Sequence, residues 1–367
     1  MLPALRHSIL AVAIMACCAG FTSCSDDKED VTPTYEVPTT YTFENVNYAG
    51  QTTRLNMLNE LNDYIKGGNN GGVLDAQKIK NMYANTAAPF ANAALNSSDK
   101  QLKNKTIATA QAQYEGYFDA VALASQSAGA PASNGTPGLL TTADGSRKYL
   151  VDAKGVELAQ LIKKGLMGAI LYYQAVDHYL TEEEIGAAVD NKTVTLGEGT
   201  AMQHHWDEAF GYFGAPTDFP ANTTSALYWA GYSTEVDAVL GSNKAIMNAF
   251  IQGRAAINAN DAKTKEAAAA TLRKEWERLA VASAIMELKE ARENVADQAK
   301  KSHYLSEGKG FVLSLAYKGD HVISDAKYNE VLTKIGDNFY TTTADDIAAA
   351  IDILSTAYQL DNIKAQL

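Results

Sequence analysis

The segment that decides the fold runs from Gln203 to Phe213 and reads Gln-His-His-Trp-Asp-Glu-Ala-Phe-Gly-Tyr-Phe. At about 100° per residue, a helix over this segment has two distinct faces. Its apolar residues recur at steps of three and four and form one stripe: Met202, Trp206, Ala209, Phe210 and Phe213. The segment therefore predicts an amphipathic helix whose apolar stripe is buried in a protein core.

The other face of this helix carries two imidazoles and a carboxylate. His204 precedes Glu208 by four residues and His205 precedes it by three, so Glu208 lies between the two rings on the helix surface. Such a group is either half of a metal site or a hydrogen-bonded ion pair. Gly211 lies on the same face, and its missing side chain lets another backbone approach closely. This face is therefore expected to contact another part of the protein.

A second segment repeats this pattern nearer the C-terminus. Residues His303–Phe311 have the order His-x-x-x-Glu-x-x-Gly-aromatic, as do residues His204–Tyr212, with Glu307 in the place of Glu208. Two helical halves, each with one such helix, would pack about an approximate twofold axis with their glycine faces in contact. Helix bundles build metal sites from imidazoles and carboxylates on facing helices. The alternatives are a chance repeat, or pairs that only staple the two halves together.

The first 23 residues have the layout of an export signal. A short basic segment precedes an apolar segment from Ile9 to Phe21, which is too short to span a bilayer as a mature helix. Residues Phe21–Cys24 resemble a bacterial lipobox, in which the cysteine is acylated after cleavage. We expect a lipoprotein signal peptide over residues 1–23 and lipidation of Cys24. An ordinary secretory signal and cleavage before Cys17 are the alternatives. After cleavage at Cys24, no cysteine is left for a disulfide.

An acidic run from Ser25 to Asp30 follows, and Pro33 and Pro38 extend a tether over residues 24–40. The acidic run resembles the signals that direct some bacterial lipoproteins to the outer face of the outer membrane; a plain linker is the alternative. We therefore expect an outer membrane lipoprotein, on the cell surface or the periplasmic face. Its membrane contact is a lipid anchor and not a spanning helix.

Charge and composition narrow the classes of function. Removal of the signal takes away one of 31 basic residues and leaves 43 acidic ones, so the mature chain carries a net charge of about −13. With this sign of charge and no basic stripe, nucleic acid is not an expected partner. The apolar content of 46% is ample for a large core.

Apolar periodicity and helix-stop signals predict an all-α protein in which strand signals are almost absent. The helical domain is expected over residues 41–365, in two bundle halves with a boundary near 215–240. We expect helices over residues 53–66, 75–82, 99–124, 156–180, 198–213, 226–232, 242–257, 261–301 and 345–360. Residues 125–155 are rich in Ser, Gly, Ala, Pro and Thr and are expected to be irregular. His178 is expected to be a core histidine with a hydrogen-bond partner.

The residues His205-Trp206-Asp207-Glu208 resemble the His-x-x-Glu motif of the imelysin-like proteins. Together with the segment Tyr41–Val46, they are similar to a related set of uncharacterised bacterial helical lipoproteins. This resemblance implies two packed helical bundles with an approximate internal twofold, a link to iron uptake and, for part of the family, peptidase activity. The chain departs from the motif at Gln203, where the family has glycine.

The resemblance and the internal repeat select different metal ligands. The resemblance implies that His205 is the metal-facing partner of Glu208, whereas the repeat selects His204. Both alternatives stay open, with His205 and Glu208 as the first choice. His303 and Glu307 are the further candidates, and the ion would be divalent iron or zinc.

The sequence offers little support for catalysis. The zinc-peptidase motif His-Glu-x-x-His, the Gly-x-Ser-x-Gly elbow and the Walker loop are all missing from it. We therefore expect a lipid-anchored helical binding protein that captures iron, another divalent metal or a metal-bearing ligand at a His/Glu site between the bundle halves. An imelysin-like metallopeptidase is one alternative. A structural surface lipoprotein whose His/Glu cluster has no binding role is the other.

Overall fold

The computed structural model describes residues 34–367, and residues 35–367 form one compact unit. The expected signal peptide, Cys24 and most of the expected tether lie outside the described residues. The compact unit begins at Tyr35, whose hydroxyl donates a hydrogen bond to Oδ2 of Asp261 over 3.0 Å.

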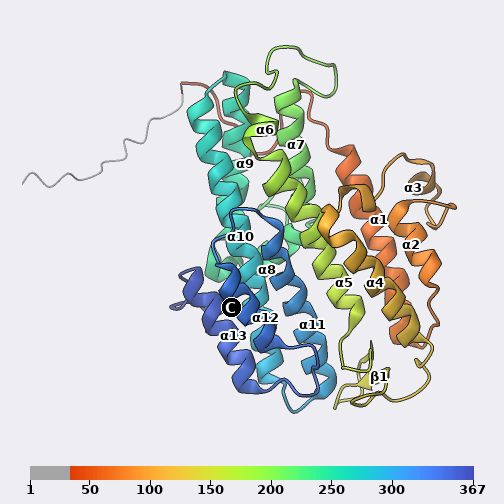
Figure 1. Ribbon diagram of the computed structural model, residues 1–367. Helices are drawn as coiled ribbons and strands as arrows, with labels where there is room; N and C mark the ends of the chain where they lie inside the picture. Colours follow the sequence, from red (N-terminus) through yellow and green to blue (C-terminus); the bar gives the residue numbers. More distant parts are fainter. Residues whose placement is uncertain (1–33) are drawn as a thin grey trace, which may run out of the picture. The chain divides into compact units, whose positions relative to one another are not determined.

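The described part of the chain is built from helices and one small sheet (Figure 1). The α-helices are α1 (Ala49–Lys66), α2 (Ala76–Ala84), α3 (Ala93–Ser97), α4 (Ala108–Ser125), α5 (Leu158–Leu166), α6 (Glu182–Ile185), α7 (Ala201–Phe213), α8 (Tyr228–Leu240), α9 (Ser242–Ala259), α10 (Ala262–Glu293), α11 (Gln298–Ser314), α12 (Asp325–Ile335) and α13 (Ala344–Ala357). Short 3₁₀ turns are η1 (Gly67–Asn70), η2 (Lys103–Lys105) and η4 (Leu315–Tyr317). The all-α prediction is confirmed. Among residues 34–367, no helix is both long and apolar enough to cross a membrane.

The sheet is a hairpin that the sequence did not predict. Strand β1 (Gly138–Thr141) pairs antiparallel with β2 (Lys148–Val151) inside the stretch expected to be irregular. The turn is held by Asp144, whose Oδ1 accepts from the Ser146 N–H (2.9 Å), and by Gly145, whose φ is +71°. Each strand has four residues, so alternation of apolar and polar residues is too brief to be recognised.

One buried helix runs through the unit and contacts both motif helices. Helix α5 continues into η3 (Met167–Tyr179), a π-helical segment in which the backbone N–H groups bond five residues back. Helix α11 packs against α5, and α7 packs against η3. The two segments with the His-x-x-x-Glu pattern therefore lie along successive parts of the same helix.

Aromatic side chains form the centre of the core. Trp206 and Phe213 of α7 pack on Phe250 of α9, and Phe213 also meets Trp276 of α10 with ring centroids 5.1 Å apart. All four side chains have 0% of their surface exposed. A Cβ on Gly253 would lie 2.0 Å from Cζ2 of Trp206, so this indole fits only because residue 253 has no side chain. The apolar stripe predicted for α7 is confirmed.

The helix predicted over residues 261–301 is in fact two helices. Helix α10 begins after Asp261, whose side chain accepts from the Thr264 N–H (3.0 Å), as the expected start requires. It ends at Glu293, and α11 begins after Asp297, whose Oδ1 accepts from the Ala299 N–H (3.0 Å). The N-capping aspartate at 297 explains the break, because its own backbone is outside the helix that it caps.

Candidate functional site

Helix α7 carries the first His–Glu pair and is fixed at its N-terminus by a capping box. The Thr200 hydroxyl accepts from the Gln203 N–H (3.2 Å), and Oε1 of Gln203 accepts from the Thr200 N–H (2.9 Å). The Gln203 amide also donates to Asn258 of α9 (2.7 Å). Gln203, where the chain departs from the imelysin-like motif, thus starts the helix and joins it to α9.

The aspartate of the motif belongs to a buried ion pair. Asp207 has 0% exposure, and its Oδ1 accepts from Nε of Arg254 (2.9 Å) and from the Tyr41 hydroxyl (2.6 Å). The Tyr41 ring stacks on Phe210 with centroids 3.8 Å apart, and the Arg254 guanidinium lies over the ring of Phe43. The two segments that carry the family resemblance therefore contact each other.

The first His–Glu pair faces helix α1. His204 Nε2 lies 3.9 Å from Oε2 of Glu208, and the Gln51 amide donates to Oε1 of Glu208 over 2.7 Å. A Cβ on Gly211 would lie 2.6 Å from Cβ of Tyr48, so the glycine lets α1 approach α7. The prediction that this face of the helix is a contact surface is confirmed.

His205 points to a different carboxylate from the one that the resemblance implies. Its Nδ1 lies 2.6 Å from the backbone oxygen of Glu184 and 3.0 Å from Oε2 of the same residue. The other oxygen, Oε1, lies 3.4 Å from Nδ1 of His178. Glu184 of α6 therefore contacts two histidines. It was not predicted from the sequence, because it is one of three consecutive glutamates, Glu182 to Glu184, that look alike. His178 was wrongly predicted to be in the core: 36% of its side chain is exposed, because it lies near the end of η3.

The second pair is more deeply buried, and its imidazole lies between two carboxylates. His303 Nδ1 is 2.6 Å from Oε2 of Glu157, and Nε2 is 3.5 Å from Oε1 of Glu307. The ring stacks on Tyr149 with centroids 4.4 Å apart. Burial lowers the pKa of His303, but the hydrogen bond to Glu157 and the two negative charges outweigh it and raise that pKa. Both ring nitrogens face carboxylates, as in a charged imidazolium.

Two further ionisable groups, Lys164 and Glu287, complete this second cluster. Nζ of Lys164, with 1% exposure, lies 3.4 Å from Oε1 of Glu307 and contacts the Tyr232 hydroxyl. Burial and the neighbouring charge of Glu307 raise the pKa of Glu287, so that it stays protonated and can donate to Glu307. Burial opposes ionisation of Glu307, yet Lys164 and that hydrogen bond lower its pKa. Glu287 and Glu307 therefore share one proton.

The two His–Glu pairs do not lie at a common helix interface. Gly211 faces α1, whereas a Cβ on Gly310 would lie 2.5 Å from Cβ of Lys164 and 3.1 Å from the Gly165 nitrogen, both in α5. The expectation that the two glycine faces meet is wrong, because each glycine admits a different helix. Among residues 34–367, no group of three or more His, Cys, Asp or Glu side chains is arranged to hold a metal ion. Metal ligation stays a prediction for the five candidates His204, His205, Glu208, His303 and Glu307.

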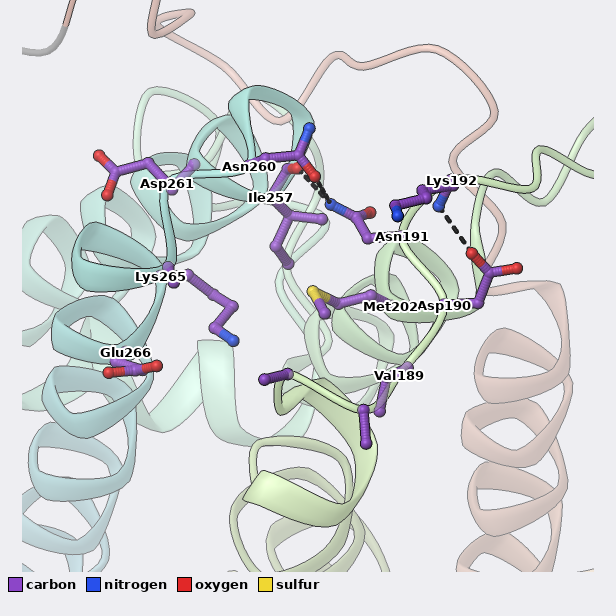
Figure 2. Close-up of a pocket in the computed structure, with 14 residues that line it drawn as sticks. Val189, Asp190, Asn191, Lys192, Met202, Ile257, Asn260, Asp261, Lys265 and Glu266 are labelled. Carbon is purple, nitrogen blue, oxygen red and sulfur yellow. Dashed lines mark hydrogen bonds between the residues drawn. The ribbon is translucent and has the colours of Figure 1, made fainter.

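A pocket of about 400 Å³ lies elsewhere, between the N-terminal end of α10 and residues 187–192, which follow α6 (Figure 2). Its apolar walls include Val189, Met202 and Ile257. The Asn191 amide closes one side by donating to the Ile257 carbonyl (2.7 Å) and to Asn260.

Lys265 of α10 points into this pocket (Figure 2). Only 4% of its surface is exposed, and its ammonium donates to the backbone carbonyl of Ile185. No carboxylate oxygen of the described residues lies within 4.0 Å of this ammonium. Buried lysines are normally paired with an anion. Sequence reasoning missed this lysine, because Lys263 and Lys265 occupy the same first turn of α10 and are the same residue type.

The chain was compared with known families, curated proteins and solved structures. No curated protein and no solved structure matches it. Residues 38–341, which include both His–Glu pairs and the pocket, match the family described as a domain of unknown function, DUF4856. Since the match covers most of its length, the chain belongs to the DUF4856 family.

Proposed function

We propose that this chain is an extracytoplasmic binding protein, tethered to a membrane through acylated Cys24, that binds a small organic anion beside Lys265. The observation that carries the proposal is the buried ammonium of Lys265, which has a backbone carbonyl as its partner and faces a cavity. A buried charge without a counter-charge is costly. An anionic ligand in the cavity would remove that cost.

The walls of the pocket favour a short-chain carboxylate as the ligand. A volume of about 400 Å³ lies within the range of small-molecule sites. The carboxylate would accept from the Lys265 ammonium, and a short aliphatic chain would contact Val189, Met202 and Ile257. Apolar walls with one placed polar group are typical of sites that select for both charge and size.

Three acidic residues line the pocket, Asp190, Asp261 and Glu266, and none has a carboxylate oxygen within 4.0 Å of the Lys265 ammonium. Glu266 is exposed to solvent. Asp190 Oδ1 accepts from the N–H groups of Lys192 (2.8 Å) and Thr193 (3.2 Å). Asp261 is bonded to Tyr35 and to the N–H and hydroxyl of Thr264. The carboxylates of Asp190 and Asp261 are thus held by local hydrogen bonds and that of Glu266 is solvated, which supports a role for the lysine in binding an anion from outside the chain.

We assign the two His–Glu pairs a structural role in an approximate internal twofold. In α1 and α7, Gly211 faces Gln51, whose amide reaches Glu208. In α5 and α11, a glycine faces Lys164, whose ammonium reaches Glu307. The same arrangement of glycine, facing polar residue and glutamate occurs in both helix pairs, and this supports the imelysin-like arrangement of two related halves.

Calorimetry with a panel of ligands tests the binding proposal. Purified protein would be titrated with acetate, butyrate and hexanoate, and with alcohols and amines of the same length. We expect binding of carboxylates only, with a lower Kd for the longer chains that still fit. Lys265→Met should abolish binding, whereas Lys263→Met, an exposed lysine of the same helical turn, should leave it unchanged. Equal binding by both variants, or by alcohols, would show that the pocket is not an anion site.

The anchor is tested separately. Growth with a labelled fatty acid should label the wild-type protein and not the Cys24→Ala variant, which should leave the membrane fraction. If the wild-type protein is unlabelled, the chain is not a lipoprotein, while the pocket proposal stands on its own titration.

A further inference from the structure

The segment between α6 and α7 has an exposed apolar tip. Leu196 has 93% of its surface exposed and Val194 59%, and Leu196 is the most exposed large apolar residue in the described part of the chain. The tip has a fixed backbone, since Thr195 and Gly199 exchange two hydrogen bonds of 2.8 Å. Leu196 lies inside this closed loop and Val194 directly precedes it, so the exposure of Leu196 is a property of the folded protein.

This tip lies at the end of the unit where the described chain begins (Figure 1). The Gly197 N–H donates to Oδ1 of Asn45 (3.0 Å), which joins the tip to the N-terminal segment. Tyr35 in turn is bonded to Asp261, in the turn between α9 and α10. The start of the compact unit, the α9–α10 turn and the apolar tip thus lie at the same end of the unit (Figure 1).

The tether limits how far this end can be from a membrane. Cys24 precedes Tyr35 by eleven residues, and a chain of that length spans at most about 40 Å when fully extended. Acylation of Cys24 therefore keeps the lipid surface within reach of Leu196 and Val194. The exposed charged residues of this segment are Asp190, Lys192 and Glu198, with a net charge of −1, so a lipid surface without net charge would not repel the tip.

We propose that Val194 and Leu196 insert into the bilayer that carries the Cys24 anchor, as a second membrane contact. This inference rests on the proposed lipid anchor, because the tether supplies the high local concentration of lipid that two side chains need. The end with Asp261 and residues 190–192 then faces the membrane, and the pocket beside Lys265 opens close to the lipid surface.

A single labelled cysteine tests this contact, because acylation blocks Cys24 and the mature chain has no other cysteine. The acylated protein with Leu196→Cys would carry an environment-sensitive fluorophore and be reconstituted in phosphatidylcholine vesicles. The matched control is Val295→Cys, which is 38% exposed and follows the far end of α10, a helix of 32 residues or roughly 48 Å. Intact mass would confirm acylation of both proteins.

We expect the probe at 196 to shift to the blue and to be quenched several-fold more by spin-labelled lipid than the probe at 295. Adding Val194→Asp should reduce that quenching at least twofold. Equal quenching at 196 and 295 in acylated protein would overturn the membrane contact and leave the anchor intact. If the intact mass shows that no acyl group is attached, both the lipid anchor and the membrane contact are ruled out. If the probe shifts in the unacylated Cys24→Ser chain as protein concentration rises without vesicles, a second copy covers the tip and the proposal is wrong.

Discussion

Substitution by glutamine should have opposite effects on the free energy of unfolding at two glutamates of the second cluster, Glu307 and Glu287. Glu307 is the ionised partner of Lys164, at 3.4 Å, and of His303, at 3.5 Å. Glu307→Gln leaves the ammonium of Lys164 buried at 1% exposure without a carboxylate in contact, although Glu157 still compensates His303. Breaking a buried pair in this way costs about 3–5 kcal/mol. We expect the lower part of that range at pH 7.

Glu287→Gln should instead cost little at acid pH and stabilise the protein at higher pH. The amide can donate to Glu307 as the protonated carboxyl does. Because the folded pKa of Glu287 is raised, its contribution to stability is complete below its unfolded pKa, near 4.5, and is lost as pH rises towards the folded pKa. The variant has no such loss. Its advantage over the wild type should therefore grow with pH, by at most about 1.4 kcal/mol per unit.

Urea unfolding at pH 5, 6.5 and 8 measures both effects. The three tryptophans, Trp206, Trp229 and Trp276, are all buried and report unfolding by fluorescence. The reasoning is refuted if Glu287→Gln is the more damaging variant at pH 7, or if its difference from the wild type does not change between pH 5 and pH 8.

Three other outcomes are expected. Gly253→Ala should lower the free energy of unfolding in urea by about 1–3 kcal/mol, since its Cβ would lie 2.0 Å from Trp206. Gly116→Ala, whose Cβ would meet nothing within 4 Å, should raise the free energy of unfolding by roughly 0.5–1 kcal/mol. Lys265→Met should raise the melting temperature of ligand-free protein by a few degrees, because a buried unpaired charge is removed; a fall would contradict the pocket proposal. Zinc or a chelator should change the melting temperature by less than about 1 °C; a zinc-dependent rise that His205→Ala removes would instead establish metal capture.

The sequence analysis missed α3 and α12, and the helix expected over residues 99–124 begins only at Ala108. It predicted most of the long helices, because apolar periodicity is a local property. It predicted the contact face at Gly211 for the same reason, since a small residue on a helix face admits a neighbour. The identity of that neighbour is not local: Gln51 is 157 residues from Glu208, and Glu157 is 146 residues from His303. No spacing rule connects such distant residues, and the two glycine faces were therefore wrongly matched with each other.

The pocket could not be predicted from the sequence, for a different reason. Lys265 differs from its neighbour Lys263 only in which side of α10 it occupies, and the difference appears when residues 185–192 fold over it. The break between α10 and α11 could have been found, because Asp297 has the residue type of an N-cap, but a continuous helical pattern on both sides concealed it.

The contact between Tyr41 and α7 has a consequence for how the chain matures. Tyr41 binds Asp207, 166 residues later, and the Arg254 that completes this ion pair comes later still. A ribosome makes the N-terminal segment first, so Tyr41 has neither Asp207 nor Phe210 as a partner until more than half of the protein has been synthesised, and the ion pair is complete only after Arg254. Nascent chains that stop short of residue 207 should therefore leave Tyr41 and Phe43 accessible to chaperones and proteases, and the first segment to be made would be among the last to dock.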